Sequence, residues 1–271
     1  MLRFQPIESF DLPELAAYRT MRLPHEHFVE RIFVAEGEKV VRRLLESDLD
    51  VLSALMPAHH AEAMRPLLEA RAPSIRVYTA ERPLLERLAG YSMYQGVLAV
   101  GRMPEPLAVE TAWQRSGRPR LFVAVDGLAN AENLGAVVRS AVAFGTHALI
   151  VGETSSSPYL RRAVRSSMGT VFDLPVVETN DLCAALAQLR AKGMRCVAAH
   201  PHTDRRTIAG ADLAQDCCLI FGNEGDGIAP AVRAACDECV AIPMPPGVDS
   251  LNVASAAAVF LFEANRQRGR M

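Results

Sequence analysis

The sequence has no apolar run close to the ~18 residues that a membrane-spanning helix needs. Its first residues, Met1 to Glu8, contain no apolar signal-peptide core either. Both absences argue against a membrane-spanning transporter and against an exported protein. We therefore expect a soluble protein in the cytoplasm, with no membrane partner.

An excess of one charge sign is also missing, because 29 Lys and Arg residues face 31 Asp and Glu residues and the formal net charge is −2. The overall charge therefore does not indicate a nucleic-acid-binding protein, and an RNA partner would need local positive charge. Short basic clusters occur at residues 42–43, 161–165, 205–206 and 266–270. Any one of them alone is read most simply as a solvated helix face.

Disulfide and zinc-finger patterns are absent. All six cysteines lie in the second half of the chain, mostly in apolar runs, which is typical of reduced core thiols. Cys236 and Cys239 form a single CxxC, no second pair follows at zinc-finger spacing, and His200 and His202 flank a proline. We expect no disulfide framework and no metal site.

Helix breakers and charge gather at residues 103–106 and 116–120, which suggests a joint between two domains. We expect a first domain at residues 1–105, a linker at 106–119 and a second domain at 120–271. The first domain mixes helix and strand patterns, so it is predicted to be a small α/β domain. Its predicted elements are a helix at 38–45 and strands at 51–56, 75–78 and 96–100.

The second domain alternates strands and helices, which predicts an α/β fold with a parallel sheet covered on both faces. In such a sheet a ligand binds outside the carboxyl ends of the strands, here after Val125, Phe221 and Ile242. The predicted strands are residues 121–125, 148–151, 196–199, 218–221 and 239–242, and the predicted helices are 133–144, 158–167, 181–192 and 250–267.

The first of these loops leads into the helix that contains Asn133 and Arg139. Asn133 stands where a helix N-cap belongs, so its side chain could simply satisfy free backbone N–H groups. Arg139 is surrounded by Val and Ala, and such an arginine pairs with an acid or reaches a phosphate.

The second loop, residues 222–227, contains three glycines, which let a backbone approach a ligand closely. Glu224 and Asp226 would repel an anion and no P-loop lysine follows, so a ligand with a positive centre, such as a sulfonium, suits this loop better than a phosphate. The alternative is a tight glycine-rich turn.

The third loop, residues 242–252, is made rigid by prolines and places Ser250 and Asn252 at the edge of the sheet. Ser250 or Asp249 can cap the last helix, which would explain one of them. Small residues at 254–258 allow a close or dimeric helix contact, or they are ordinary helix formers.

Together these segments resemble the SpoU/TrmH family of SPOUT RNA methyltransferases, with residues 133–139, 221–225 and 242–253 as its three motifs in order. Residues 33–41 and 95–100 resemble the N-terminal substrate-binding domain that many members carry, which is similar to a ribosomal RNA-binding protein. One departure is visible, because Ala131 stands where the family commonly has proline.

The resemblance implies a deep C-terminal trefoil knot and a homodimer with active sites at the subunit interface. It also implies that S-adenosylmethionine binds in a bent shape within the knot, and that RNA, ribosomal more than transfer RNA, is the partner. The implied catalytic residues are Asn133, Arg139, Glu224, Ser250 and Asn252, and the implied cofactor-binding residues are Gly222, Ile242, Met244 and Leu251.

The expected reaction is methyl transfer to a ribose 2′-hydroxyl. Because a guanidinium is effectively always protonated, we read Arg139 as a donor that orients the neighbouring phosphate, not as the base. Three alternatives remain: a SPOUT methyltransferase that acts on a base nitrogen, an inactive RNA-binding protein, and a nicotinamide dehydrogenase. The last is disfavoured because no GxGxxG follows a strand.

Overall fold

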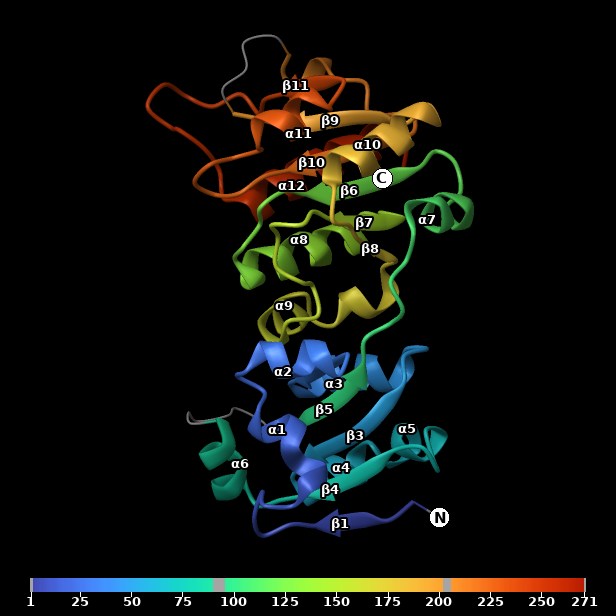
Figure 1. Ribbon diagram of the computed structural model, residues 1–271, viewed down its shortest axis with the longest axis vertical. Coiled ribbons are helices and arrows are strands. Elements are labelled where there is room, and N and C mark those ends of the chain that lie inside the picture. Colours follow the sequence, from blue (N-terminus) through green and yellow to red (C-terminus); the bar gives the residue numbers. More distant parts are fainter. Residues whose placement is uncertain (1, 90–95, 202–205, 271) are drawn as a thin grey trace. The chain divides into compact units, whose positions relative to one another are not determined.

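The computed structural model describes residues 2–89, 96–201 and 206–270, and the chain separates into two compact units (Figure 1). Unit 1 comprises Met1–Glu105 with Tyr159–Phe172, and unit 2 comprises Pro106–Pro158 with Asp173–Met271. Residues 159–172, which the sequence assigns to the second domain, therefore pack with the first. That the two parts are separate folding domains stays a prediction.

Unit 1 contains a mixed sheet with the strand order β1-β4-β3-β5-β2. Strands β1, β4 and β3 run parallel, and β5 is antiparallel to both β3 and β2. The predicted strand at 51–56 is confirmed, and the other two are shifted by one or two residues. The strands are β1 (Phe4–Pro6), β2 (Ile32–Glu36), β3 (Val51–Met56), β4 (Arg76–Thr79) and β5 (Leu98–Arg102).

Short helices surround this sheet, and α3 confirms the predicted helix at 38–45. Its buried residues, Val40, Val41, Leu44 and Leu45, recur at helical spacing and face the sheet. The helices are η1 (Pro13–Leu15), α1 (Ala16–Arg19), α2 (Pro24–Val29), α3 (Glu38–Glu46), α4 (Ala58–Ala63), α5 (Arg65–Ala70), α6 (Arg82–Ala89), α9 (Arg161–Ser166) and η2 (Thr170–Asp173).

An aromatic contact fixes residues 159–172 on unit 1. The ring of Phe33 in β2 stacks on Phe172 with centroids 5.3 Å apart, and it meets Tyr159 at 5.8 Å. Phe33 is fully buried, so its burial depends on this late segment of the chain.

Unit 2 contains a six-stranded sheet with the order β11-β9-β10-β6-β7-β8, in which every pairing is parallel. The predicted parallel sheet is therefore confirmed. The short strand β8 was not predicted. The strands are β6 (Leu121–Val125), β7 (Ala148–Val151), β8 (Val176–Glu178), β9 (Arg195–Ala199), β10 (Cys217–Phe221) and β11 (Glu238–Val240).

Helices cover both faces of this sheet. On one face, buried side chains of α7, α10 and α11 pack with those of the strands in a single core cluster. On the other face α8 packs against α12, and Phe260 of α12 meets Phe221 of β10 edge to face at 5.8 Å. The helices are α7 (Val109–Arg115), α8 (Ala131–Ala143), α10 (Leu182–Ala191), η3 (Ile208–Gly210), α11 (Pro230–Ala234) and α12 (Val253–Gln267).

Three predicted helix starts are wrong. Helix α8 begins at Ala131, because Asn130 and not Asn133 is its N-cap: the Asn130 Oδ1 accepts from the backbone N of Glu132 and of Asn133 at 2.9 and 3.1 Å. Helix α9 begins three residues after Pro158, which lies in the preceding turn. Asn252, and neither Ser250 nor Asp249, caps α12.

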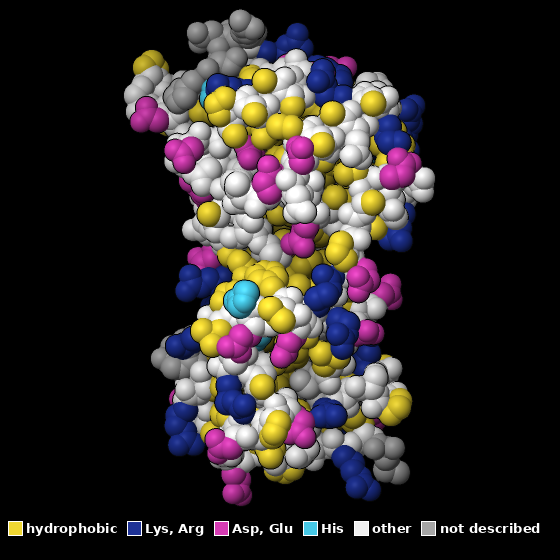
Figure 2. All heavy atoms as spheres, in the orientation of Figure 1, with side chains coloured by type: hydrophobic (Ala, Val, Ile, Leu, Met, Phe, Trp, Pro, Cys, Tyr) yellow, Lys and Arg dark blue, Asp and Glu magenta, His cyan; other side chains and the backbone are white. Residues whose placement is uncertain are grey.

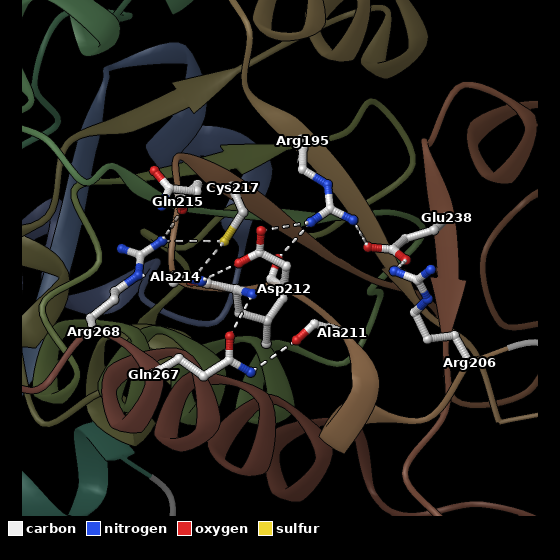
Figure 3. Close-up of polar contacts among 11 residues, drawn as sticks. Arg195, Arg206, Ala211, Asp212, Ala214, Gln215, Cys217, Glu238, Gln267 and Arg268 are labelled. Atoms are coloured by element: carbon white, nitrogen blue, oxygen red, sulfur yellow. Dashed lines mark hydrogen bonds and ion pairs between the residues drawn. The ribbon is translucent and has the colours of Figure 1, made fainter.

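The last turn of α12 is fixed by loops from earlier parts of unit 2 (Figure 3). Gln267 accepts from the Leu213 backbone N at 2.7 Å and donates to the Ala211 carbonyl at 2.9 Å. Arg268 donates to the carbonyl oxygens of Pro119, Arg120, Leu213 and Gln215, at 2.6 to 3.2 Å. These bonds satisfy a charged group at a helix end and hold the C-terminal helix against two separate loops.

The six cysteines are free thiols, and burial raises the pKa of Cys196 to about 12 and of Cys217 to about 11, so both stay protonated at neutral pH.

Within the described residues, His, Cys, Asp and Glu side chains form no group of three or more that could hold a metal. No described helix combines the length and apolar character that crossing a bilayer requires. Basic and acidic side chains alternate over the face shown in Figure 2.

Candidate active site

The loops after β9, β10 and β11 surround one cavity of about 370 Å³ in unit 2. All four residues that the sequence predicts to bind cofactor line it, together with Glu224 and Ser250. Its lining from these loops and from α12 includes Gly222, Glu224, Ile242, Met244, Ser250, Leu251, Val253 and Phe260. The carboxyl ends of these neighbouring parallel strands thus form the kind of crevice in which α/β proteins bind ligands.

A chain of polar side chains joins the three predicted motifs. Asn133, in the first turn of α8, donates from its side-chain amide to the Glu224 carboxylate. Asn252 donates from Nδ2 to Oδ1 of Asn133 at 3.2 Å. The other end of the Asn252 side chain accepts from the Ala254 backbone N at 2.9 Å, as the N-cap of α12. Both ends of the two amides are therefore used, which fixes their orientation.

Asn223 organises the glycine-rich loop, a role that the sequence analysis missed. Its Nδ2 donates to the Gly127 carbonyl at 2.8 Å, and its Oδ1 accepts from the Gly225 backbone N at 2.7 Å. The backbones of Asn223 and Gly227 also exchange two hydrogen bonds of 2.9 and 3.0 Å. The signal in the sequence is the position of an asparagine among glycines, where its side chain can close the turn.

Gly222 is required by this closure. A Cβ at Gly222 would lie 2.3 Å from the carbonyl carbon and oxygen of Gly227, which no side chain can tolerate. Asp126, after β6, fixes the residues that follow this loop, since its buried carboxylate accepts a hydrogen bond from the Ala229 backbone N at 2.7 Å. The glycine therefore permits a close backbone approach within the loop that lines the cavity.

His200, after β9, is a further lining residue that the sequence analysis left out of the site. Its Nε2 lies 3.0 Å from Nη1 of Arg233 in α11, so the guanidinium donates to a neutral ring nitrogen. In the sequence, His200 stands out only as a possible metal ligand, because its neighbour Arg233 lies 33 residues away.

Arg139 lies apart from these residues. It is exposed on α8, it is not among the residues that line the cavity, and within the described residues no hydrogen bond or ion pair is found for it. Ser250 lines the cavity and is exposed. Within one copy of the chain, the structure thus brings together every predicted site residue except Arg139.

The chemistry of the cavity suits a ligand with a positive centre. Many of its lining side chains are apolar, and three carboxylates, Glu224, Asp226 and Asp249, are among its described lining residues. A sulfonium gains Coulomb energy from such carboxylates, and the cavity volume falls within the range of small-molecule sites. The residues present therefore fit S-adenosylmethionine.

The comparisons with known proteins agree. The model of the SpoU rRNA methylase family matches residues 120–262. An uncharacterized tRNA/rRNA methyltransferase of Mycobacterium tuberculosis is 32% identical over 274 residues, which cover 98% of this chain and 93% of the relative. The 23S rRNA (guanosine-2′-O-)-methyltransferase RlmB of Pectobacterium atrosepticum is 30% identical over 241 residues, 86% of this chain and 97% of the relative.

The fold is also found in a solved cofactor complex. The SpoU methyltransferase AviRb of Streptomyces viridochromogenes, in complex with S-adenosylmethionine, superimposes with a TM-score of 0.81 at 27% identity, over 94% of this chain and 100% of that one. The chain therefore belongs to the SpoU rRNA methylase family, and it is an RNA methyltransferase whose cofactor is S-adenosylmethionine.

Proposed function

We propose that this enzyme methylates a ribose 2′-hydroxyl of ribosomal RNA. The observation that carries the proposal is the polar chain Asn252–Asn133–Glu224, which joins all three motif loops beside the cavity. Its donors and acceptors are oriented in advance, as the placement of a hydroxyl group requires.

The chain's own backbone and apolar side chains would hold the cofactor. The cavity is lined by Gly222, Ile242, Met244 and Leu251. When bound, S-adenosylmethionine supplies an electrophilic methyl group on sulfur. Glu224 accepts a hydrogen bond from Asn133, so its carboxylate fixes the amide, and as a lining residue it would stabilise the positive centre of a bound cofactor.

Transfer requires the ribose oxygen ~3–3.5 Å from the methyl carbon and in line with sulfur. Asn133, Ser250 and Asn252 are the groups that would hold the ribose in this position. Arg139 would donate to the adjacent phosphate, since a guanidinium binds phosphate with two parallel hydrogen bonds and does not act as a base at neutral pH.

A homodimer is part of this proposal. Helix α12 and the loop before it expose large apolar side chains, Val248, Leu251, Val259 and Phe262, which are 39 to 48% exposed. Residues 255, 259 and 262 are exposed along one face of α12, as a helix packing against a second copy requires. A partner's Arg139 would then complete the site, since the chain's own Arg139 lies outside its cavity.

We also propose the C-terminal trefoil knot, a role for unit 1 in RNA binding and a cytoplasmic location. The knot is proposed from the family resemblance; the bonds of Gln267 and Arg268 fix the end of α12 against residues 211–217 and 119–120.

The substrate is tested with tritiated S-adenosylmethionine and separated ribosomal and transfer RNA. We expect label in ribosomal RNA, as the name of the Pectobacterium relative suggests. Mass spectrometry of the labelled nucleosides then distinguishes a ribose from a base nitrogen. Cofactor binding without transfer to any RNA would favour the inactive RNA-binding alternative.

A further inference from the structure

Six basic side chains from two distant parts of the sequence come together on unit 1. Helices α3 and α9 contribute three each, and we call their set the α3–α9 basic surface. Its members are Lys39, Arg42, Arg43, Arg161, Arg162 and Arg165. The sequence shows two separate basic clusters here, and only the fold unites them.

Glu36 of β2 and the turn after α9 bring the two helices close to each other. Arg161 and Arg165 both pair with Glu36, the last residue of β2, and the Arg165 contact is 3.3 Å. Arg43 lies beside the turn after α9, where its Nη1 is 3.5 Å from the Met168 carbonyl oxygen. A Cβ at Gly169 would lie 3.3 Å from the Arg43 Cδ, so this turn and the α3 side chain are in close contact.

Helical spacing places the remaining cations on the same surface. Lys39 is four residues before Arg43, and Arg162 is three residues before Arg165, so each pair shares a helix face. Lys39 and Arg162 are exposed, and the Arg165 side chain is 61% exposed although it touches Glu36. These three cations are therefore available to solvent.

Two acids near this surface pair with three of its cations. Glu36 is buried and shared between Arg161 and Arg165, and Glu38 pairs with Arg42 at 3.6 Å. Within the described residues, Lys39 and Arg162 have no ion-pair partner.

We propose that the α3–α9 basic surface binds the phosphate backbone of the RNA substrate. The proposal deepens the function proposed above and rests on it for the identity of the polyanion. Arginines match phosphate with a planar fork, and the buried Glu36 holds two of them in fixed positions, so little side-chain entropy is lost on binding. Backbone contacts of this kind fix the register of an RNA without reading its sequence.

The test replaces two residues that touch no acid. The double variant Lys39→Gln/Arg162→Gln is compared with Arg76→Gln/Arg87→Gln, which removes two exposed cations elsewhere on unit 1. The probe is a fluorescein-labelled RNA hairpin, titrated by anisotropy over a range of salt concentrations. Each lost phosphate contact changes the slope of log K against log salt by about 0.9.

We expect the slope of the α3–α9 variant to become less negative by about 1.8, with a roughly tenfold loss of affinity at physiological salt. The control variant should bind as the wild-type chain does, and all proteins should bind S-adenosylmethionine equally. Arg165→Gln adds an independent variant and should move the slope in the same direction.

A slope and affinity equal to those of the control would overturn the proposal, and so would displacement of the RNA by poly-glutamate at equal charge. Tritium transfer by the wild-type protein is measured alongside. If transfer to every RNA is absent while the slope changes as expected, the proposed function fails and the surface stands. If transfer is present and the slope is unchanged, the surface alone fails.

Discussion

Asn252 donates a hydrogen bond of 3.2 Å to Asn133, 119 positions earlier in the sequence. The same Asn252 caps α12, and the same Asn133 holds Glu224. The start of the last helix, the first turn of α8 and the glycine-rich loop are thus fixed relative to one another by two amides. If these residues act in catalysis as proposed, the geometry of the site depends on the cap of α12.

Two substitutions of Asn252 separate these roles. Asn252→Ser keeps a good N-cap and loses the amide donor, whereas Asn252→Ala loses both. Both should lower kcat roughly tenfold, the rate equivalent of one lost hydrogen bond. Only the alanine variant should lose about 1 kcal/mol in urea unfolding. Full activity in the serine variant would show that the Asn252–Asn133 bond is not used in catalysis.

Arg139→Ala should reduce methyl transfer by roughly 10²–10³-fold, as expected for a lost charge-stabilising donor. Its affinity for S-adenosylmethionine in calorimetry should not change, because Arg139 does not line the cavity. Arg139→Lys keeps the charge without the fork, so partial activity is expected. Near-normal turnover of the alanine variant would refute the assigned role.

Gly222→Ala should abolish cofactor binding, since the new Cβ would lie 2.3 Å from the Gly227 backbone and the loop must open. Overpacking of this kind costs about 1–3 kcal/mol, which a thermal melt detects. Gly225→Ala is the matched control, because its Cβ would lie 3.4 Å from a side-chain oxygen of Asn223. Equal cofactor affinities of the two variants would contradict the role given to Gly222.

Phe262→Glu should convert the proposed dimer to a monomer, because it places like charges opposite each other at the α12 face. Light scattering measures the mass, and methyl transfer should fall with it if a partner's Arg139 completes each site. Phe28→Glu, an exposed aromatic on α2 of unit 1, is the control. A wild-type monomer with full activity would exclude a shared active site.

Much of unit 2 could be predicted because its strands are short buried runs between clear breakers, as at Leu121–Val125. Local pattern cannot decide between two equivalent asparagines, so it predicts Asn133 as the N-cap of α8, whereas Asn130 provides it. It also cannot show that residues 159–172 pack with unit 1, because the Phe33–Phe172 contact joins residues far apart in sequence. The role of Asn223 was hidden for the same reason, since its partner Gly127 belongs to another loop.

The most direct test is alkaline hydrolysis of ribosomal RNA labelled with tritiated S-adenosylmethionine. A methyl group on the ribose 2′-oxygen blocks cleavage of the adjacent phosphodiester, so we predict that the tritium remains in alkali-resistant dinucleotides. Tritium in mononucleotides would mean that a base is methylated, and it would contradict the assignment of the ribose hydroxyl as the acceptor.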